Sequence, residues 1–276
     1  PDLYKAESDQ NLSSLRSLQV VSTHDESELI ENAVLRGRLL GECSNLARRL
    51  ANEPSNQLSP SILAEQALEI LKGTSLEIDV LDEESIRELG MGLLLGVAQG
   101  SVEAPRVIVM RHEPSGVTEG PVLALIGKGV TFDSGGISLK PAESMERMKE
   151  DMSGGAAVIC AMRAISQLNP SIRVIGIVPT TENMPGGRAV KPGDVLYGAS
   201  GTTVEVINTD AEGRLILADA LWYAMELGAT HLVDVATLTG GCVVALGNTT
   251  SGLFGAPDSW VNTVQDIANQ AGDRVW

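Results

Sequence analysis

The stretch Val204-Glu205-Val206-Ile207-Asn208-Thr209-Asp210-Ala211-Glu212-Gly213-Arg214-Leu215 decides the fold. Its first four residues are predicted to form a strand, residues 213–227 a helix, and residues 231–236 a second strand. The octapeptide 208–215 joins the first strand to the helix. Strand, helix and strand in this order are typical of a βαβ unit, in which a helix connects two parallel strands.

The same alternation runs through most of the chain. Further strands are predicted at residues 76–81, 106–110, 122–126 and 173–179, and further helices at residues 26–51, from Pro60 to about Leu71, 83–89 and 154–168. This pattern predicts an α/β fold with a mainly parallel central sheet. Such folds carry their sites on the loops that follow the carboxyl ends of the strands.

The composition excludes several classes of protein. Hydrophobic residues make up 43% of the 276 residues, which is enough to bury a core. The formal net charge of −16 argues against a nucleic acid or an anionic membrane as partner. No apolar run reaches membrane-spanning length. The three cysteines form no CxxC pair, which favours a reducing, cytoplasmic compartment, and the apolar surroundings of Cys160 and Cys242 predict core thiols.

Two acids of the octapeptide indicate a metal site. Asp210 and Glu212 would point to the same side of an extended segment, and Gly213 would then permit a sharp turn into the helix. Neighbouring carboxylates repel each other unless a cation or a proton neutralises them. The alternative is a solvated edge of the fold, on which the two acids face water.

A second group of polar residues surrounds a glycine-rich loop at residues 127–140, directly after the strand 122–126. The loop supplies Lys128, Asp133 and Lys140, and Asp151 follows just before a helix. Taken singly, the lysines could be surface residues and the two acids turn or cap residues. A phosphate loop is excluded because the required first glycine and the Ser or Thr after the lysine are missing.

Histidine offers no alternative set of ligands. The three histidines are far apart and form no HExxH, so a metal site here must consist mainly of carboxylates. Such a site suits Mg²⁺ or Mn²⁺, and Zn²⁺ also accepts Asp and Glu.

These residues resemble a known family. Lys128, Asp133, Lys140, Asp151 and the octapeptide match, in order and spacing, the signatures of the leucyl (cytosol) aminopeptidase family of dinuclear metallopeptidases. The resemblance implies a three-layer α/β/α catalytic domain at residues 52–276, a linker helix at 26–51 and a remnant of an N-terminal domain at 1–25. Because family members extend further at both ends, we expect a fragment that is weakly active or poorly stable alone.

The resemblance also implies a role for each residue. Two divalent ions, Zn²⁺ or Mn²⁺ with Mg²⁺ or Co²⁺ as alternatives at the exchangeable site, would be bound. The tighter ion would be held by Lys128, Asp133, Asp151 and Glu212, and the other by Asp133, Glu212 and both the side chain and the carbonyl of Asp210. Lys140 would polarise the scissile carbonyl, and Arg214 would hold bicarbonate. The pocket for the first side chain would be lined by Met148, Thr237, Leu238 and Gly240.

The implied function is the release of N-terminal amino acids, leucine preferred, from peptides with a free N-terminus. A water bridging both metal ions would attack the carbonyl, with bicarbonate as general base, in a cytoplasmic homohexamer. One alternative is a catalytically silent family member that acts as a binding or assembly module, but the ligand set is intact. Another is a different dinuclear carboxylate enzyme such as a phosphoesterase, which a lysine ligand and a bicarbonate-binding arginine fit badly.

Overall fold

The computed structural model describes residues 4–5, 17–21 and 27–276. The chain divides into two compact units, Pro1–Thr237 and Leu238–Trp276. Of the predicted remnant at residues 1–25, all but residues 4–5 and 17–21 lie outside the described residues. The predicted helix 26–51 is present as α1, Ser27–Asn52.

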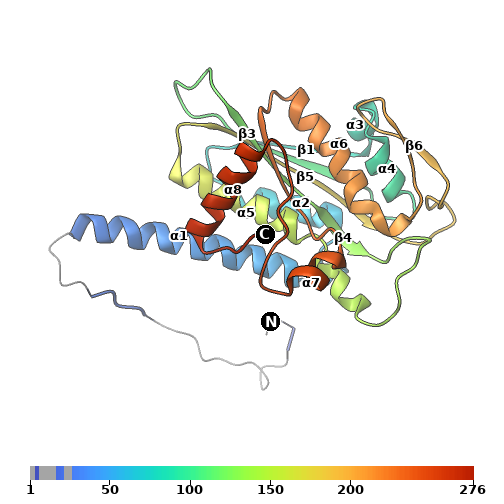
Figure 1. The fold of residues 1–276 in the computed structure, drawn as a ribbon, viewed down its shortest axis with the longest axis horizontal. Coiled ribbons are helices and arrows are strands. Elements are labelled where there is room, and N and C mark those ends of the chain that lie inside the picture. Colours follow the sequence, from blue (N-terminus) through green and yellow to red (C-terminus); the bar gives the residue numbers. More distant parts are fainter. Residues whose placement is uncertain (1–3, 6–16, 22–26) are drawn as a thin grey trace. The chain divides into compact units, whose positions relative to one another are not determined.

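A six-stranded sheet forms the centre of the first unit (Figure 1). Its strands are β1 (Glu77–Leu81), β2 (Arg106–His112), β3 (Val122–Gly127), β4 (Gly129–Asp133), β5 (Arg173–Asn183) and β8 (His231–Val235). The order is β1-β2-β5-β3-β8, with β4 pairing on β5. The β3–β5, β3–β8 and β4–β5 pairs are parallel, whereas β1–β2 and β2–β5 are antiparallel. The sheet is therefore mixed and mainly parallel, as expected.

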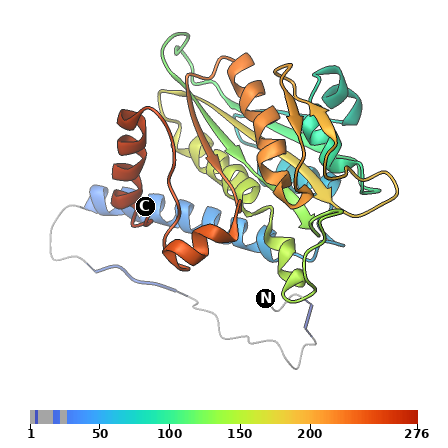
Figure 2. The same cartoon turned by 45° about the vertical axis from the view of Figure 1, so that its right-hand side comes forward.

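Helices cover both faces of this sheet, which confirms the α/β/α layers (Figure 2). On one face lie α2 (Pro60–Ile70) and α5 (Ser153–Leu168), with α1 packed on α5; on the other lie α3 (Glu83–Glu88), α4 (Gly92–Ala98) and α6 (Glu212–Glu226). Alternate residues of β2 face opposite layers: Val107 and Val109 join the core beneath α4 and α6, while Ile108 and Met110 join the core beneath α2 and α5. The two cores follow from the period of two along a strand.

Two sequence predictions are wrong in this unit. Residues 204–207 are not a strand of the central sheet, because β7 (Thr203–Glu205) pairs with β6 (Val195–Tyr197) in a separate antiparallel hairpin. The backbone hydrogen-bonding groups of β7 are paired by β6, which lies shortly before it in the sequence. Conversely, part of the predicted glycine-rich loop is strand β4. A Cβ at Gly129 would lie 2.7 Å from the Pro179 carbonyl oxygen, so its glycine permits close pairing with β5.

The second unit contains α7 (Gly240–Leu246), α8 (Asp258–Ala271) and a parallel bridge between Ser251 and Val275. Its cysteine, Cys242, is half-buried, so it is not the core thiol that its apolar neighbours predicted. Within the described part of the chain, none of the helices combines the length and the apolar character needed to cross a membrane.

Candidate metal centre

Strands β3, β4 and β5 bring three polar side chains to one edge of the sheet. Lys128 follows the last residue of β3, Asp133 ends β4, and Asn183 ends β5. The backbone of Lys128 is held between β8 and α5: its N–H donates to the Val235 oxygen at 3.0 Å, and its carbonyl accepts from Gly155 N at 2.7 Å. Because these strands are parallel, their carboxyl ends place the side chains together.

The octapeptide supplies two more acids from a turn and a helix. Thr209–Ala211 forms the 3₁₀ turn η3, which Asn208 Oδ1 caps by accepting from Asp210 N at 2.9 Å, and Glu212 begins α6. The predicted extended segment is therefore wrong, because an Asn that caps its own backbone favours a turn. Gly213 lies inside α6 rather than in a sharp turn. A Cβ there would come within 2.9 Å of Lys128 Nζ, so the glycine leaves room for the lysine.

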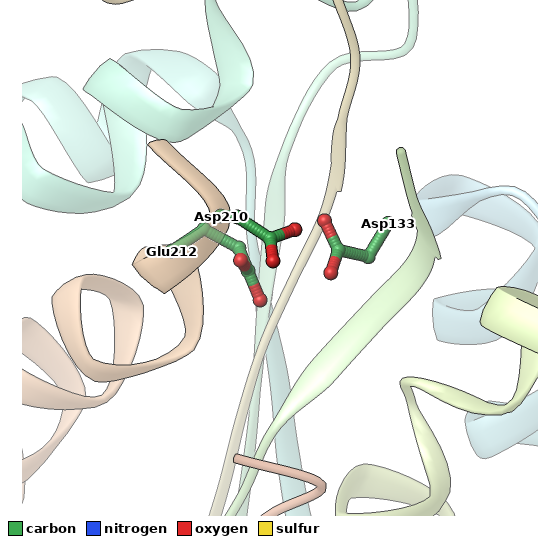
Figure 3. A group of neighbouring side chains, drawn as sticks. All are labelled: Asp133, Asp210 and Glu212. Atoms are coloured by element: carbon green, nitrogen blue, oxygen red, sulfur yellow. The ribbon is translucent and has the colours of Figure 1, made fainter. Parts of the chain in front are cut away.

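Three carboxylates converge between these elements, as Figure 3 shows. One oxygen from each of Asp133, Asp210 and Glu212 lies within 4.8 Å of the others. Asp133 and Glu212 are only 3% and 2% exposed, and Asp210 is half-buried. The structure thus places Asp133 and Glu212 in the interior rather than on a solvated edge, whereas Asp210 is partly open to solvent.

Lys128 lies among the acids and is not a surface lysine. Its Nζ is 2.8 Å from Asp151 Oδ2 and 2.7 Å from Glu212 Oε1, and it donates to the Thr237 carbonyl at 2.9 Å. Burial alone lowers the pKa of Lys128, but the charges of Asp151 and Glu212 outweigh this, and the pKa is raised above its usual value. In this arrangement Lys128 is an ammonium ion that neutralises two buried acids.

Lys140 bridges the remaining two acids. Its Nζ lies 2.8 Å from Asp133 Oδ2 and 2.5 Å from Asp210 Oδ1. Burial by itself lowers the pKa of Lys140. The hydrogen bonds to Asp133 and Asp210 and the negative charges of these acids raise it by more, so the pKa is above its usual value. The preceding loop turns through Gly135 and Gly136, whose φ angles of 88° and 66° favour glycine.

Asp151 is the acid whose ionisation is most disturbed. Burial raises its pKa to about 7, against the charge of Lys128 and with the negative charge of Glu212 adding to the rise. Its Oδ1 accepts from Lys128 at 2.9 Å and from Thr237 Oγ1 at 2.8 Å. Asp151 thus belongs to the same cluster, although it lies on another segment, two residues before α5 begins.

Two further residues of this centre, Asn183 and Thr209, were not predicted from the sequence. Asn183 donates to the cluster from the end of β5, and Thr209 Oγ1 donates to the Gly135 carbonyl at 2.7 Å while accepting from Ser138 N at 2.8 Å. Thr209 therefore ties the octapeptide to the loop after β4. The position of Asn183 at the carboxyl end of a long buried strand is the signal that could have identified it.

The donor set fits divalent cations. Lys128 and Lys140 oppose the four carboxylates of Asp133, Asp151, Asp210 and Glu212, leaving a formal net charge of −2. Asp151 Oδ2 and Asp210 Oδ1 are buried and accept no hydrogen bond of good geometry from the described residues, although each lies close to an ammonium nitrogen. Uncompensated buried charge is costly, so a site of this kind favours cations, and carboxylates suit Mg²⁺, Mn²⁺ or Zn²⁺.

Of the other predicted site residues, only Thr237 forms hydrogen bonds with side chains of this cluster within the described residues. Arg214 is exposed on α6 and makes no ion pair with the described residues, and Met148 is half-buried on the 3₁₀ helix η2, Met145–Glu150. Thr237 contacts Asp151, as described above, and Leu238 and Gly240 belong to the second unit. Substrate-binding roles for these residues stay predictions.

Known proteins share this arrangement of sequence and fold. The pattern of the "Cytosol aminopeptidase family, catalytic domain" matches residues 45–276. Two relatives, each named "Probable cytosol aminopeptidase", are from Koribacter versatilis, 47% identical over 277 residues, and Solibacter usitatus, 51% identical over 276 residues. Both alignments cover 100% of this chain but 54% and 56% of those proteins, so the chain spans about half the length of these relatives.

A solved structure agrees with this assignment. The bottromycin maturation enzyme BotP, solved in complex with Mn, superposes with a TM-score of 0.84 at 40% identity, covering 89% of this chain and 54% of BotP. The match at residues 45–276 includes every acid and lysine of the metal centre. The chain therefore belongs to the cytosol aminopeptidase family and contains residues of its catalytic domain.

Proposed function

We propose that the full-length protein is a metal-dependent aminopeptidase that removes N-terminal amino acids from peptides. The observation that carries this proposal is the buried cluster of four carboxylates and two lysines, with a net charge of −2, at the carboxyl edge of the sheet. Two comparisons support this proposed activity: the chain belongs to the cytosol aminopeptidase family, and the similar enzyme BotP was solved in complex with Mn.

The residues would divide between two cation sites. Lys128, Asp133, Asp151 and Glu212 would hold one ion, with Lys128 as a neutral amine because nearby dications lower its pKa. Asp133, Asp210 and Glu212 would hold the other. Two ammonium groups already lie among the acids at separate places, Lys128 between Asp151 and Glu212 and Lys140 between Asp133 and Asp210, which supports two centres of positive charge. When bound, divalent cations supply an acidified water and polarise the peptide carbonyl.

The chain's own side chains would then orient the substrate. Lys140 is 22% exposed, so its ammonium group can reach a substrate, and its raised pKa keeps it protonated. It would donate a hydrogen bond to the carbonyl oxygen as negative charge develops there. The exposed guanidinium of Arg214 would bind bicarbonate through paired hydrogen bonds, which makes bicarbonate available to accept a proton.

Substrate choice and assembly are the finer parts of the proposal. Met148 and Thr237 would contact a leucine-like side chain of the substrate, and the substrate-binding roles of Leu238 and Gly240 stay predictions from the family resemblance. Zn²⁺ or Mn²⁺ would occupy the sites, with Mg²⁺ or Co²⁺ as alternatives at the exchangeable one. The cytoplasmic location and the homohexamer remain predictions from the family resemblance.

The two alternatives are less well supported. A silent binding module would have no need for four acids in a largely buried cluster, since buried charges are costly to maintain. A phosphoesterase would have to accommodate Lys128, which is 2% exposed and bonded to two acids, in its metal shell.

The test is hydrolysis of leucine p-nitroanilide by the full-length protein, with Mn²⁺ or Zn²⁺ and after chelation. Asp210→Asn and Glu212→Gln should each lower the rate by more than about 100-fold. Glu205→Gln is the control, because Glu205 is exposed on β7 and should leave the rate unchanged. Absence of peptide hydrolysis with metals fully bound, or turnover of p-nitrophenyl phosphate instead, would overturn the proposal.

A further inference from the structure

We propose that Asn183 is a positioning residue of the metal centre, whose side-chain amide holds Asp133, Glu212 and the octapeptide turn at the separation that metal binding requires. The inference rests on the proposed function. It concerns a residue that contacts the predicted ligands without being one of them.

The amide of Asn183 is buried and surrounded by acceptors. The side chain is 2% exposed, and its Nδ2 lies 2.8 Å from Asp133 Oδ1, 3.0 Å from the Thr209 carbonyl and 3.5 Å from Glu212 Oε2. All three partners are acceptors, so the NH₂ group, and not the amide oxygen, must face them. One hydrogen of the NH₂ group is donated to Asp133 and the other to Thr209. The longer contact to Glu212 must share one of these two hydrogens.

The contact to Asp133 decides which carboxylate oxygen remains available. Asp133 Oδ1 accepts from Asn183 at 2.8 Å and from Gly135 N at 2.9 Å, which uses both of its lone pairs. Oδ2 instead lies toward the positive charge, 2.8 Å from Lys140 Nζ. Asn183 therefore fixes the rotation of the carboxylate and presents a single oxygen to a cation.

The contact to Thr209 joins separate parts of the chain. Thr209 lies in η3, one residue before Asp210, so this bond anchors the turn that carries the second acid. Asn183 is itself held, because its carbonyl accepts from Ser134 N at 3.0 Å and from Ser134 Oγ at 2.7 Å. The end of β5 is thus a fixed point to which both β4 and the octapeptide are bonded.

Thr180 provides a matched control on the same strand. It is 0% exposed, and its Oγ1 has no hydrogen-bond partner within the described residues. Thr180→Val removes a buried polar atom three positions from Asn183 without removing a contact to any predicted ligand. A general disturbance of β5 should therefore affect both variants, whereas a positioning role affects Asn183 alone.

The experiment titrates Mn²⁺ into the metal-free full-length protein and follows the bound ions by calorimetry and by electron paramagnetic resonance. Asn183→Ala should weaken Mn²⁺ binding by about 10–100-fold. It should also reduce the exchange-coupled signal of paired ions, while Thr180→Val should match the wild type. Asn183→Ser is the second variant, with a hydroxyl too short to reach all three acceptors, and serves if the alanine variant does not fold.

The outcomes separate this inference from the proposed function. Unchanged Mn²⁺ affinity and coupling in folded Asn183→Ala or Asn183→Ser, or an equal loss in Thr180→Val, overturns the positioning role alone. A wild-type protein that binds no Mn²⁺ overturns the proposed function, and the positioning role with it. Circular dichroism of each metal-free variant establishes that it is folded before titration.

Discussion

Lys128 Nζ lies 2.7 Å from Glu212 Oε1, and each of these side chains is only 2% exposed. One residue follows strand β3 and the other begins helix α6, so the ion pair joins the sheet to the helix layer. Asp151, two residues before α5 of the opposite layer, contacts the same ammonium group. A single lysine therefore connects all three layers of the fold at the metal centre.

Replacing this lysine should destabilise the metal-free protein. Lys128→Met keeps most of the side-chain volume but leaves Asp151 and Glu212 buried without a positive charge. Loss of one partner of a buried ion pair costs about 3–5 kcal/mol, which urea unfolding of the full-length protein would measure. Lys72→Met is the control, because Lys72 is 75% exposed and its one ion pair in the described part of the chain is with an exposed glutamate. Equal stability of the two variants would contradict the structural role of Lys128.

Metal ions should stabilise the folded protein. A cation that binds only the native state raises the free energy of unfolding by about 2.7 kcal/mol at a concentration 100 times its dissociation constant. Thermal unfolding of the full-length protein with Mn²⁺ and with a chelator would measure this increase. The increase should be smaller for Asp210→Asn, which lacks one acid of the cluster. An unfolding temperature that does not respond to metal in the wild type would refute the prediction.

Close packing around Gly154 should make it intolerant of substitution. A Cβ at this position would lie 2.0 Å from the Val235 oxygen and 3.1 Å from Lys128 N, so Gly154→Ala must push α5 away from the sheet. We expect a loss of at least about 1–3 kcal/mol in unfolding free energy. At exposed Gly187 nothing lies within 4 Å of an added Cβ, so Gly187→Ala should change stability little. Similar denaturation curves for the two variants would show that α5 can shift without cost.

Asp219 should stabilise the helix layer by accepting hydrogen bonds. Its carboxylate, 1% exposed, accepts from the backbone N–H groups of Leu93, Leu94 and Ala199 at 2.9–3.0 Å. Burial raises the pKa of Asp219, and these three hydrogen bonds oppose the rise. Asp219→Ala leaves the donors without their acceptor and should cost about 1–3 kcal/mol.

The control for Asp219 lies on the same helix. Glu226 is exposed near the end of α6, so Glu226→Ala should leave the unfolding free energy nearly unchanged. Chemical denaturation of the two variants would measure the unfolding free energy that each loses. If the two lose equal stability, the hydrogen bonds of Asp219 contribute nothing beyond the helix propensity of α6.

The three cysteines should differ in reactivity toward an alkylating reagent. Burial raises the pKa of the Cys160 thiol to about 12 and also raises that of Cys43, and these residues are 2% and 5% exposed. Even at about pH 9, only about one Cys160 thiol in a thousand would be ionised. Half-buried Cys242 should therefore react first, as peptide mass spectrometry would show. Denatured protein, in which all three react, is the control; rapid native labelling of Cys160 would contradict its burial.

Much of the fold follows from local pattern, and the exceptions have physical causes. The buried strands and amphipathic helices were predicted because the spacing of apolar residues along each segment shows whether one or both of its faces are buried. Strand β4 was missed because Gly129 is required for close approach to β5, although glycine ordinarily indicates a loop. Strand β7 was placed in the wrong sheet because its sequence does not specify whether its partner is a local hairpin or the central sheet.

The sequence by itself determined which chemical groups are available: Asp133, Asp210, Glu212 and two lysines in family spacing, on an α/β chain. Only the tertiary structure decided how they are used. In the folded chain Lys128 is buried between acids of two layers, and Gly213 leaves room for its side chain. Asn183 lies between Asp133 and Thr209 and donates to both. Periodicity reports which face of a segment is covered, whereas contacts between distant residues depend on how those faces pack.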